Sequence, residues 1–135
     1  MTSITEMNNE PSGQQISEII ARINDKKFHE ATLSIDDLIT VFANSSILYS
    51  LRGTIELSTG NFDKAVKYFL TAKENNPNRK EVYFDLGTAY EYKLEYDAAI
   101  ENFLKVLTLD KEHVASLNSL GNLYLKMGNF QKAFS

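Results

Sequence analysis

Histidine is the side chain that most often carries acid–base chemistry or binds a metal near neutral pH, and this chain of 135 residues contains two of them. His29 stands between Phe28 and Glu30 near the start of an expected helix, and His113 stands in a polar turn with Asp110. Neither histidine has a second one at the spacing of a metal-binding helix motif. We interpret His29 as a solvated or helix-capping side chain and expect His113, in the turn between repeats, to have a surface role.

The other residue types that could support catalysis are also isolated. Asp36 and Asp37 are adjacent, but neighbouring helix positions point about 100° apart, so the two carboxyl groups cannot share a proton. The chain has no cysteine, and its 6 glycines occur singly, without the spacing of a phosphate-binding loop. Asn44-Ser45-Ser46 has the form of a glycosylation site but suits a helix N-cap better. We therefore expect a protein that is not an enzyme and has no cofactor or metal site.

Composition and charge narrow the class of partner. The formal net charge is −4, which disfavours nucleic-acid binding. The aromatic residues Tyr90, Tyr92, Tyr96 and Phe103 fall mostly on core positions, so a base-stacking surface is not expected. No stretch approaches the ~18 apolar residues of a membrane span, and the N-terminus lacks the features of a secretory signal. We expect a cytoplasmic protein that binds neither nucleic acid nor membranes, with residues 1–11 as a flexible lead-in.

The chain repeats itself with a fixed period of about 34 residues, which takes Gly53 to Gly87 and Gly87 to Gly121. At this offset small residues align with small ones and aromatic residues with aromatic ones. Each repeat holds two helix-period patterns, which are separated by turn residues such as Gly60-Asn61 and Gly128-Asn129. Since a short break between two amphipathic helices forces the chain to reverse, each repeat is expected to form an antiparallel helix hairpin.

Small residues at fixed places predict how each hairpin closes. Glycine inside a helix costs about 1 kcal/mol relative to alanine, so three glycines at one phase indicate a packing role. We expect these glycines, with alanines on the second helices, to let the two backbones approach, while aromatic residues fill the space beside them. The glycines are Gly53, Gly87 and Gly121, the alanines Ala65, Ala99 and Ala133, and the aromatic residues Phe62, Tyr96 and Phe130.

This pattern resembles the tetratricopeptide repeat (TPR) family, whose units are helix pairs of about 34 residues. Arg52 and Glu56 depart from it, since Leu and Tyr are usual at these two places. The resemblance implies an all-α, right-handed α-solenoid of antiparallel helix hairpins with about 3.5 repeats. The residues of the third unit that carry the match are Tyr83, Leu86, Gly87, Tyr90, Ala99 and Phe103.

The repeat register divides the chain. We expect a degenerate TPR-like hairpin at 12–45, regular repeats at 46–79 and 80–113, and a truncated repeat at 114–135. In the first hairpin the expected turn is at Asn24-Asp25, and the second helix is expected from about His29 to Phe42. In the last repeat, the stop signal at Gly128-Asn129 predicts a second helix that begins at Phe130.

The resemblance implies a non-catalytic protein–protein interaction scaffold that binds a peptide segment in a concave groove lined by the first helices. The places that contact ligands in the family hold neither the Lys, Arg and Asn of a carboxylate clamp nor a ladder of Asn. They suit an extended peptide with a basic side chain near Asp85 and Glu91, and Lys126 lies one turn further along. The predicted peptide-binding residues are Ser50, Thr54, Phe84, Asp85, Thr88, Glu91, Asn118, Ser119 and Asn122.

The truncated repeat leads to two alternative hypotheses. One is a self-assembling structural module that forms a homodimer through an exposed C-terminal edge. The other is an N-terminal partner- or substrate-positioning module of a larger enzyme, such as a transferase or oxygenase. The edge residues expected to be exposed are Leu117, Leu120, Tyr124 and Met127.

Overall fold

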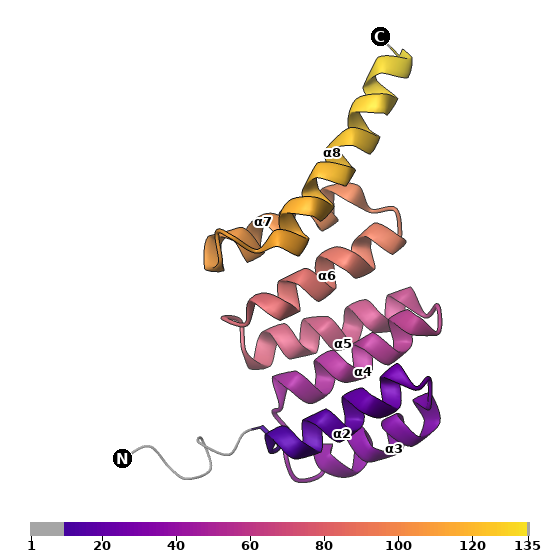
Figure 1. The fold of residues 1–135 in the computed structure, drawn as a ribbon, viewed down its shortest axis with the longest axis vertical. Coiled ribbons are helices and arrows are strands. Elements are labelled where there is room, and N and C mark those ends of the chain that lie inside the picture. The colour runs from indigo at the N-terminus through magenta and orange to yellow at the C-terminus, as the bar shows by residue number, and fades with distance from the viewer. Residues whose placement is uncertain (1–9, 135) are drawn as a thin grey trace. The chain divides into compact units, whose positions relative to one another are not determined.

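The computed structural model describes residues 10–134, with side chains from residue 10 to residue 128. This part of the chain folds into helices and contains no strand, as predicted (Figure 1). Residues 1–9 of the expected lead-in lie outside the described residues, and so do the side chains of Phe130 and Ala133. The helices are α2 (Gly13–Asn24), α3 (Phe28–Ile39), α4 (Ser46–Ser58), α5 (Phe62–Asn75), α6 (Lys80–Tyr92), α7 (Tyr96–Leu109) and α8 (Val114–Phe134).

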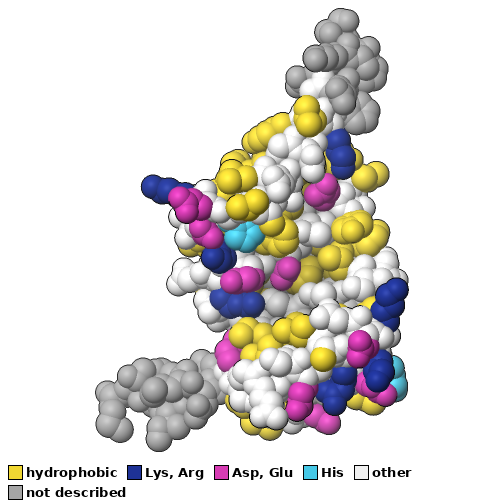
Figure 2. Space-filling model, viewed as in Figure 1, with side chains coloured by type: hydrophobic (Ala, Val, Ile, Leu, Met, Phe, Trp, Pro, Cys, Tyr) yellow, Lys and Arg dark blue, Asp and Glu magenta, His cyan; other side chains and the backbone are white. Residues whose placement is uncertain are grey.

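The helices form two compact units, Met1–Pro77 with α2 to α5 and Asn78–Ser135 with α6 to α8. Helices α4 and α5 pack together in the first unit, as do α6 and α7 in the second. On the face drawn in Figure 2, side chains of both charges are interspersed. Within residues 10–134, no helix combines the length and the apolar character needed to cross a bilayer. Helix starts recur with the period seen in the sequence, at Ser46, Lys80 and Val114 for the first helices and at Phe28, Phe62 and Tyr96 for the second.

The same local structure reverses the chain in each of the three hairpins. A residue with left-handed backbone follows the first helix: Lys26 (φ 61°), Gly60 (φ 86°) and Leu94 (φ 63°). The next N–H then donates to a carbonyl five residues back, as from Asn61 to Glu56 at 2.8 Å. This Schellman arrangement satisfies carbonyl groups that the helix end leaves unpaired.

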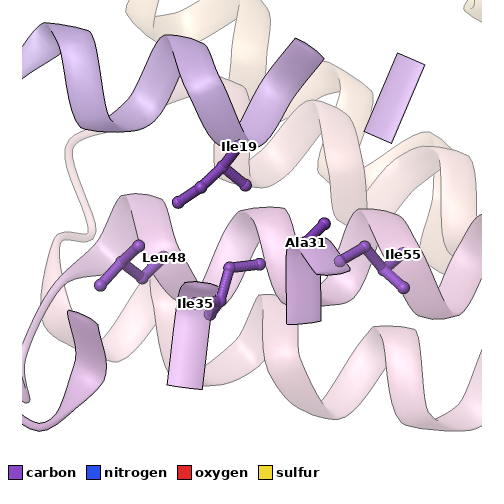
Figure 3. Packing of buried hydrophobic residues seen from close by; sticks show 5 residues of the cluster. All are labelled: Ile19, Ala31, Ile35, Leu48 and Ile55. Atoms are coloured by element: carbon purple, nitrogen blue, oxygen red, sulfur yellow. The ribbon is translucent and has the colours of Figure 1, made fainter. Parts of the chain in front are cut away.

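The core of the first unit joins three helices. Ile19 of α2, Ile35 of α3 and Leu48 of α4 are each at most 1% exposed, and Ala31 and Ile55 complete the cluster (Figure 3). Helix α3 ends at Ile39, three residues before the Phe42 expected from the sequence. The buried residues of the first hairpin thus pack against α4, the first helix of the next hairpin.

Two glycines of the first helices, Gly53 and Gly87, pack against aromatic rings. The sequence had instead suggested that the glycines face the backbone of the second helix, beside its alanines. A Cβ placed on Gly53 would lie 2.5 Å from Cε1 of Phe69, and one on Gly87 would lie 2.7 Å from Cε1 of Phe103. The rings fill the space because each second helix carries its phenylalanine directly opposite the glycine. An added Cβ on Gly121 would meet no described atom within 4 Å.

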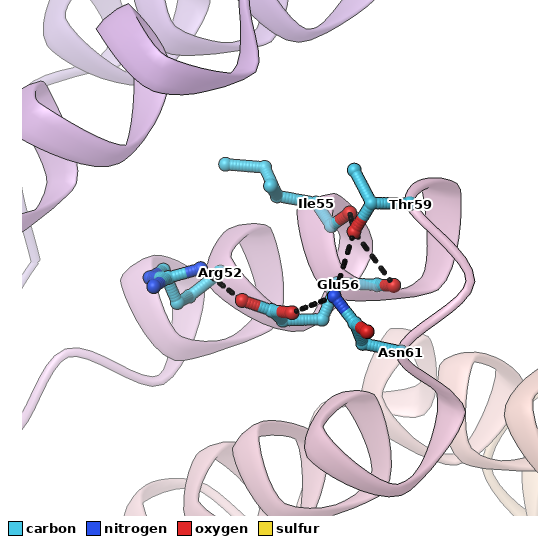
Figure 4. Close-up of polar contacts among 5 residues, drawn as sticks. All are labelled: Arg52, Ile55, Glu56, Thr59 and Asn61. Atoms are coloured by element: carbon cyan, nitrogen blue, oxygen red, sulfur yellow. Dashed lines mark hydrogen bonds and ion pairs between the residues drawn. The ribbon is translucent and has the colours of Figure 1, made fainter.

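The two departures from the repeat pattern, Arg52 and Glu56, form one partly buried network in the first unit (Figure 4). Nη1 of Arg52 donates to Oε1 of Glu56 at 2.6 Å, and Nδ2 of Asn61 donates to Oε2 at 2.9 Å. The Arg52 guanidinium also lies 5.0 Å from the centre of the Tyr68 ring on α5. Glu56 is only 7% exposed, so its charge is stabilised by these partners.

The N-terminus of α4 is capped from two directions. The Ser45 hydroxyl accepts from the amide of Leu48 at 3.0 Å, which confirms the predicted N-cap. The Glu10 carboxylate accepts from the Ser45 hydroxyl and from the amide of Ile47. The expectation of a flexible lead-in as far as residue 11 is therefore wrong at Glu10, because the unpaired amides of a helix N-terminus attract a carboxylate.

Helix α8 corrects two expectations for the last repeat. It runs without a break from Val114 to Phe134, so the turn predicted at Gly128-Asn129 is absent. A continuous helix retains a backbone hydrogen bond at each residue, which a turn would give up. Leu120, predicted to be exposed, is 5% exposed because α8 packs on α7, where Leu120 joins Ala99 and Phe103. The other predicted edge residues are partly to largely exposed: Leu117 (48%), Tyr124 (52%) and the half-buried Met127.

Candidate functional site

One helical face of α6 and one of α8 supply the polar side chains of a groove in the second unit. Phe84, Thr88 and Glu91 follow one another at i, i+4 and i+7 on α6, so they lie on one stripe. Ser119 and Lys126 are seven residues apart on α8 and likewise share a face. Helical periodicity thus places each of these two sets of residues on one face of its own helix.

The groove has a volume of about 550 Å³. Tyr92 and Leu94, at the end of α6 and in the turn that follows, extend its apolar lining and are 59% and 71% exposed. The groove is therefore a surface hollow with aromatic and aliphatic walls. Its lining residues are Phe84, Thr88, Glu91, Tyr92, Leu94, Ser119 and Lys126.

The Phe84 ring holds one wall of the groove in place. Its centre lies 5.6 Å from that of Phe103 on α7 and 5.3 Å from that of His113. Nδ1 of His113 accepts a hydrogen bond from the amide of Ser116 at 3.2 Å, which caps the start of α8. His113 was expected to have only a surface role, but it caps α8 and its ring links the wall on α6 to the start of α8.

An ion pair connects the two sides of the groove. Nζ of Lys126 on α8 lies 3.4 Å from Oε2 of Glu91 on α6, and it also lies 5.8 Å from the centre of the Tyr96 ring. The Thr88 hydroxyl donates to the carbonyl of Phe84 at 2.9 Å, so its oxygen can still accept a hydrogen bond from a ligand. The groove therefore combines apolar walls, hydroxyl groups and one charge of each sign.

Asp85 lies outside the groove lining and has an unusual charge state. Burial raises the pKa of its carboxyl from 3.8 to about 7, and Glu81 adds to the rise while Arg79 opposes it. Because Asp85 neighbours Phe84 on a helix, its side chain points about 100° away from the stripe that faces the groove. A basic ligand group held jointly by Asp85 and Glu91, as the sequence suggested, does not fit this arrangement.

The structure brings together four of the nine predicted peptide-binding residues. Phe84, Thr88, Glu91 and Ser119 line the groove, whereas Asp85, Asn118 and Asn122 of the same unit do not. Ser50 and Thr54 belong to the first unit. The remaining lining residues that the prediction missed, Tyr92 and Leu94, lie where α6 ends, and the helical pattern alone gives no signal for them.

The structure also corrects the expectation that Ser50 faces a peptide ligand, because Ser50 is only 5% exposed. It shares a stripe of α4 with Ser46 and Gly53, at i, i+4 and i+7. Both neighbours pack against α5, because the Ser46 hydroxyl donates to the carbonyl of Ala72 at 2.8 Å and Gly53 lies under Phe69. Ser50 thus lies on the packed side of α4.

Within the described part of the chain, no group of three or more His, Cys, Asp or Glu is placed to hold a metal ion. The groove itself contains one carboxylate, and the other polar groups of its side chains are three hydroxyls and an ammonium. This arrangement suits non-covalent binding of a segment with an apolar side chain and backbone hydrogen-bonding groups.

Comparisons with known proteins agree with this architecture. Residues 11–116 match the family described as Iml2/Tetratricopeptide repeat protein 39. The chain is 31% identical over 105 residues to the Hsp70-Hsp90 organising protein of Plasmodium falciparum, an alignment that covers 73% of this chain and 18% of that protein. It spans between 6% and 18% of the length of the curated relatives that it matches.

Two solved structures have the same fold. The Sgt2 TPR domain from Aspergillus fumigatus has a TM-score of 0.81 at 18% identity, over 93% of this chain and 86% of that one. The first TPR of Spaghetti (RPAP3), bound to the HSP90 peptide SRMEEVD, has a TM-score of 0.80 at 16% identity, over 84% of this chain and 93% of that one. The all-α, TPR-like fold predicted from the sequence is thus confirmed.

Proposed function

We propose that this chain, which belongs to the Iml2/Tetratricopeptide repeat protein 39 family, is a non-catalytic protein-interaction scaffold that binds an extended peptide in the groove of α6 and α8. The observation that carries the proposal is the groove itself, where residues on two first helices converge around a hollow of about 550 Å³. That volume falls within the roughly 300–1,000 Å³ that is typical of ligand-binding clefts. The proposal includes a cytoplasmic location.

The lining indicates what kind of peptide fits. Phe84 and Tyr92 offer aromatic surface for one apolar side chain of the peptide, and the hydroxyls of Thr88 and Ser119 offer hydrogen bonds to its backbone. Glu91 and Lys126 neutralise each other at 3.4 Å, so the groove has no excess of either charge. We therefore infer a ligand of low net charge at the groove, which replaces the basic side chain suggested by the sequence.

Related proteins support the class of ligand. The solved structure of the first TPR of Spaghetti (RPAP3) contains an HSP90 peptide, and the relative from Plasmodium falciparum is named as an Hsp70-Hsp90 organising protein. Peptides and other proteins are therefore the class of partner that we propose for this chain.

The test is a selection of peptides from a random displayed library on the chain, followed by measurement of the Kd of the selected peptides. Thr88→Arg places a long side chain in the groove and is expected to weaken binding by at least about tenfold, which corresponds to about 1.4 kcal/mol. Thr71→Arg on α5 is the matched control, since Thr71 also bonds to a carbonyl four residues earlier (3.1 Å, against 2.9 Å for Thr88).

Circular dichroism checks that both variants remain helical. Equal binding by the two variants, or the absence of any enriched peptide, would contradict binding in this groove.

A further inference from the structure

One residue that lines the groove has an unfavourable backbone conformation. Each hairpin turn places a residue in the left-handed region, at Lys26 (φ 61°), Gly60 (φ 86°) and Leu94 (φ 63°). The repeat period takes Gly60 to Leu94 and Leu94 to Gly128, so glycine stands one period before and one period after the leucine. Glycine adopts this conformation without strain, whereas an L-residue does not. Leu94 therefore lowers the stability of the fold relative to a glycine at the same place.

The hairpin itself does not require a leucine there. Leu94 is 71% exposed, so its side chain adds little to the core. An apolar residue just before a helix can pack on the fourth residue of that helix, here Ala99 of α7, but most of the Leu94 side chain lies in solvent. The turn is closed by backbone hydrogen bonds of 2.9 Å from the amides of Leu94 and Glu95 to the carbonyls of Glu91 and Tyr90. These bonds form with any side chain.

The side chain of Leu94 is placed at the groove. Leu94 and Tyr92, which is 59% exposed, both belong to the groove lining and extend its apolar surface beyond the end of α6. An apolar side chain that is both exposed and held on a strained backbone is unfavourable for the free chain. Residues of this kind are typical of ligand-binding sites, where the ligand supplies the missing contacts.

We propose that Leu94 selects the peptide that binds in the groove, by contacting an apolar side chain of that peptide together with Tyr92. The inference rests on the proposed function and specifies its ligand, which carries an aliphatic or aromatic side chain at the place opposite Leu94. Binding then removes the exposed apolar surface of Leu94 from water, which glycine at this place would not offer.

Leu94→Gly is expected to move stability and binding in opposite directions. Glycine relieves the left-handed backbone, so the equilibrium constant for unfolding, measured in urea, is expected to fall by about two- to fivefold. The apolar contact is lost, so the Kd of peptides selected from the random library on the original chain is expected to rise by at least about tenfold.

Lys26→Gly is the matched control. Lys26 has the same left-handed backbone in the hairpin turn of the first unit, whereas the groove lies in the second. Lys26→Gly is therefore expected to stabilise the chain to a similar degree and to leave the Kd of the selected peptides unchanged.

Two further variants separate the side chain from the flexibility that glycine introduces. Leu94→Asn keeps a side chain and tolerates left-handed backbone, but it is polar, so it is expected to weaken binding as Leu94→Gly does. Leu94→Met remains apolar and is expected to retain most of the affinity, with a rise in Kd of no more than about threefold.

A double-mutant cycle tests the contact directly. Alanine in place of the apolar residue of a selected peptide is expected to weaken binding to the original chain by at least about tenfold. The same change in the peptide is expected to weaken binding to Leu94→Gly by less than about threefold, because the contact is already absent.

Three results would overturn the proposal. One is an equal Kd for Leu94→Gly and the original chain, and another is a loss of binding that Lys26→Gly shares. The third is a lower stability of Leu94→Gly, because the leucine would then serve the fold. If Thr88→Arg loses binding and Leu94→Gly does not, the groove binds peptides without selection by Leu94. If neither variant changes binding, the proposed function fails as well.

Discussion

At the scale of single residues, the absence of one Cβ decides how the two helices of a hairpin meet. Gly53 and Gly87 leave the space that Phe69 and Phe103 occupy. The sequence predicted a packing role for these glycines because they share one phase of the repeat. It did not predict the ring as the partner, since a repeat shows which residues are equivalent and not which residues touch.

Substitution by alanine separates the packing role of glycine from its helix propensity. Gly87→Ala is expected to lower the free energy of unfolding by about 1–3 kcal/mol, because the new methyl group displaces the Phe103 ring. Gly121→Ala is expected to raise it by about 1 kcal/mol, because only the propensity changes. Urea denaturation measures both, and shifts of the same sign would contradict the packing account.

The Arg52–Glu56 pair makes a second prediction at this scale. Arg52→Leu leaves a carboxylate that is 7% exposed without its closest cation, and it should lower the free energy of unfolding by about 3 kcal/mol. Arg52→Leu/Glu56→Tyr installs the residues of the next unit, Leu86 and Tyr90, and should come within about 1 kcal/mol of the original chain. If chemical denaturation shows the double variant to be as unstable as Arg52→Leu, the loss of stability does not come from the unpaired Glu56 carboxylate.

Asp85 predicts how stability depends on pH. Its pKa, raised by burial from 3.8 to about 7, means that the folded chain holds a proton that the unfolded chain has released between these values. The contribution of this group to the free energy of unfolding is therefore complete below pH 3.8 and is lost as the pH rises through about 7.

Asp85→Asn removes this titration and should raise the free energy of unfolding at pH 8 by at least about 1 kcal/mol, with little change at pH 3.5. Denaturant titrations at several pH values measure the difference between the variant and the original chain. Asp37→Asn, which alters an exposed carboxylate on α3, is the control. If the difference in free energy of unfolding between Asp85→Asn and the original chain does not vary with pH, the titration of Asp85 is not the cause of that difference.

At the scale of elements, each hairpin depends on one residue with left-handed backbone. Only Gly60 is a glycine, and Lys26 and Leu94 adopt the same conformation at the equivalent places. Sequence signals placed the turns at Asn24-Asp25 and Gly60-Asn61, because these residues favour helix ends. The lysine and the leucine carry no such signal, and the hydrogen bonds of the turn together with the packing of both helices hold them there.

Gly60→Ala tests the requirement for this conformation. An L-residue in the left-handed region costs roughly 1–2 kcal/mol, so the variant should lower the free energy of unfolding by about 1 kcal/mol. Gly13→Ala is the control, because Gly13 lies at the start of α2 without a positive φ. A melting temperature that is equal for the two variants would show that the turn tolerates a side chain.

The sequence predicted most of the elements but not how far the last helix extends. The predicted period agrees with the starts of α4, α6 and α8, and the cap at Ser45 follows from its residue type. The continuous α8 was missed because Gly128-Asn129 has the composition of a turn. Composition favours a turn only when a second helix packs back on the first, and a local signal does not report that packing.

At the scale of the whole molecule, the described chain is two compact helical units, and the candidate site lies within one of them. Four lining residues followed from the helical register, because spacing fixes which side chains share a stripe. Asp85, Asn118 and Asn122 were predicted beside them but do not line the groove, since the register alone did not separate the stripe that faces it from its neighbours.

The central claim is that α6 and α8 together bind a peptide, and a map of backbone amide chemical shifts tests it most directly. The isotope-labelled chain of 135 residues is titrated with a peptide selected from the random library. We predict that the largest shifts occur at residues 84–94 and 119–126, and that Thr88→Arg abolishes them while Thr71→Arg does not. Binding with shifts confined to α2–α5, or shifts that persist in Thr88→Arg, would contradict the claim.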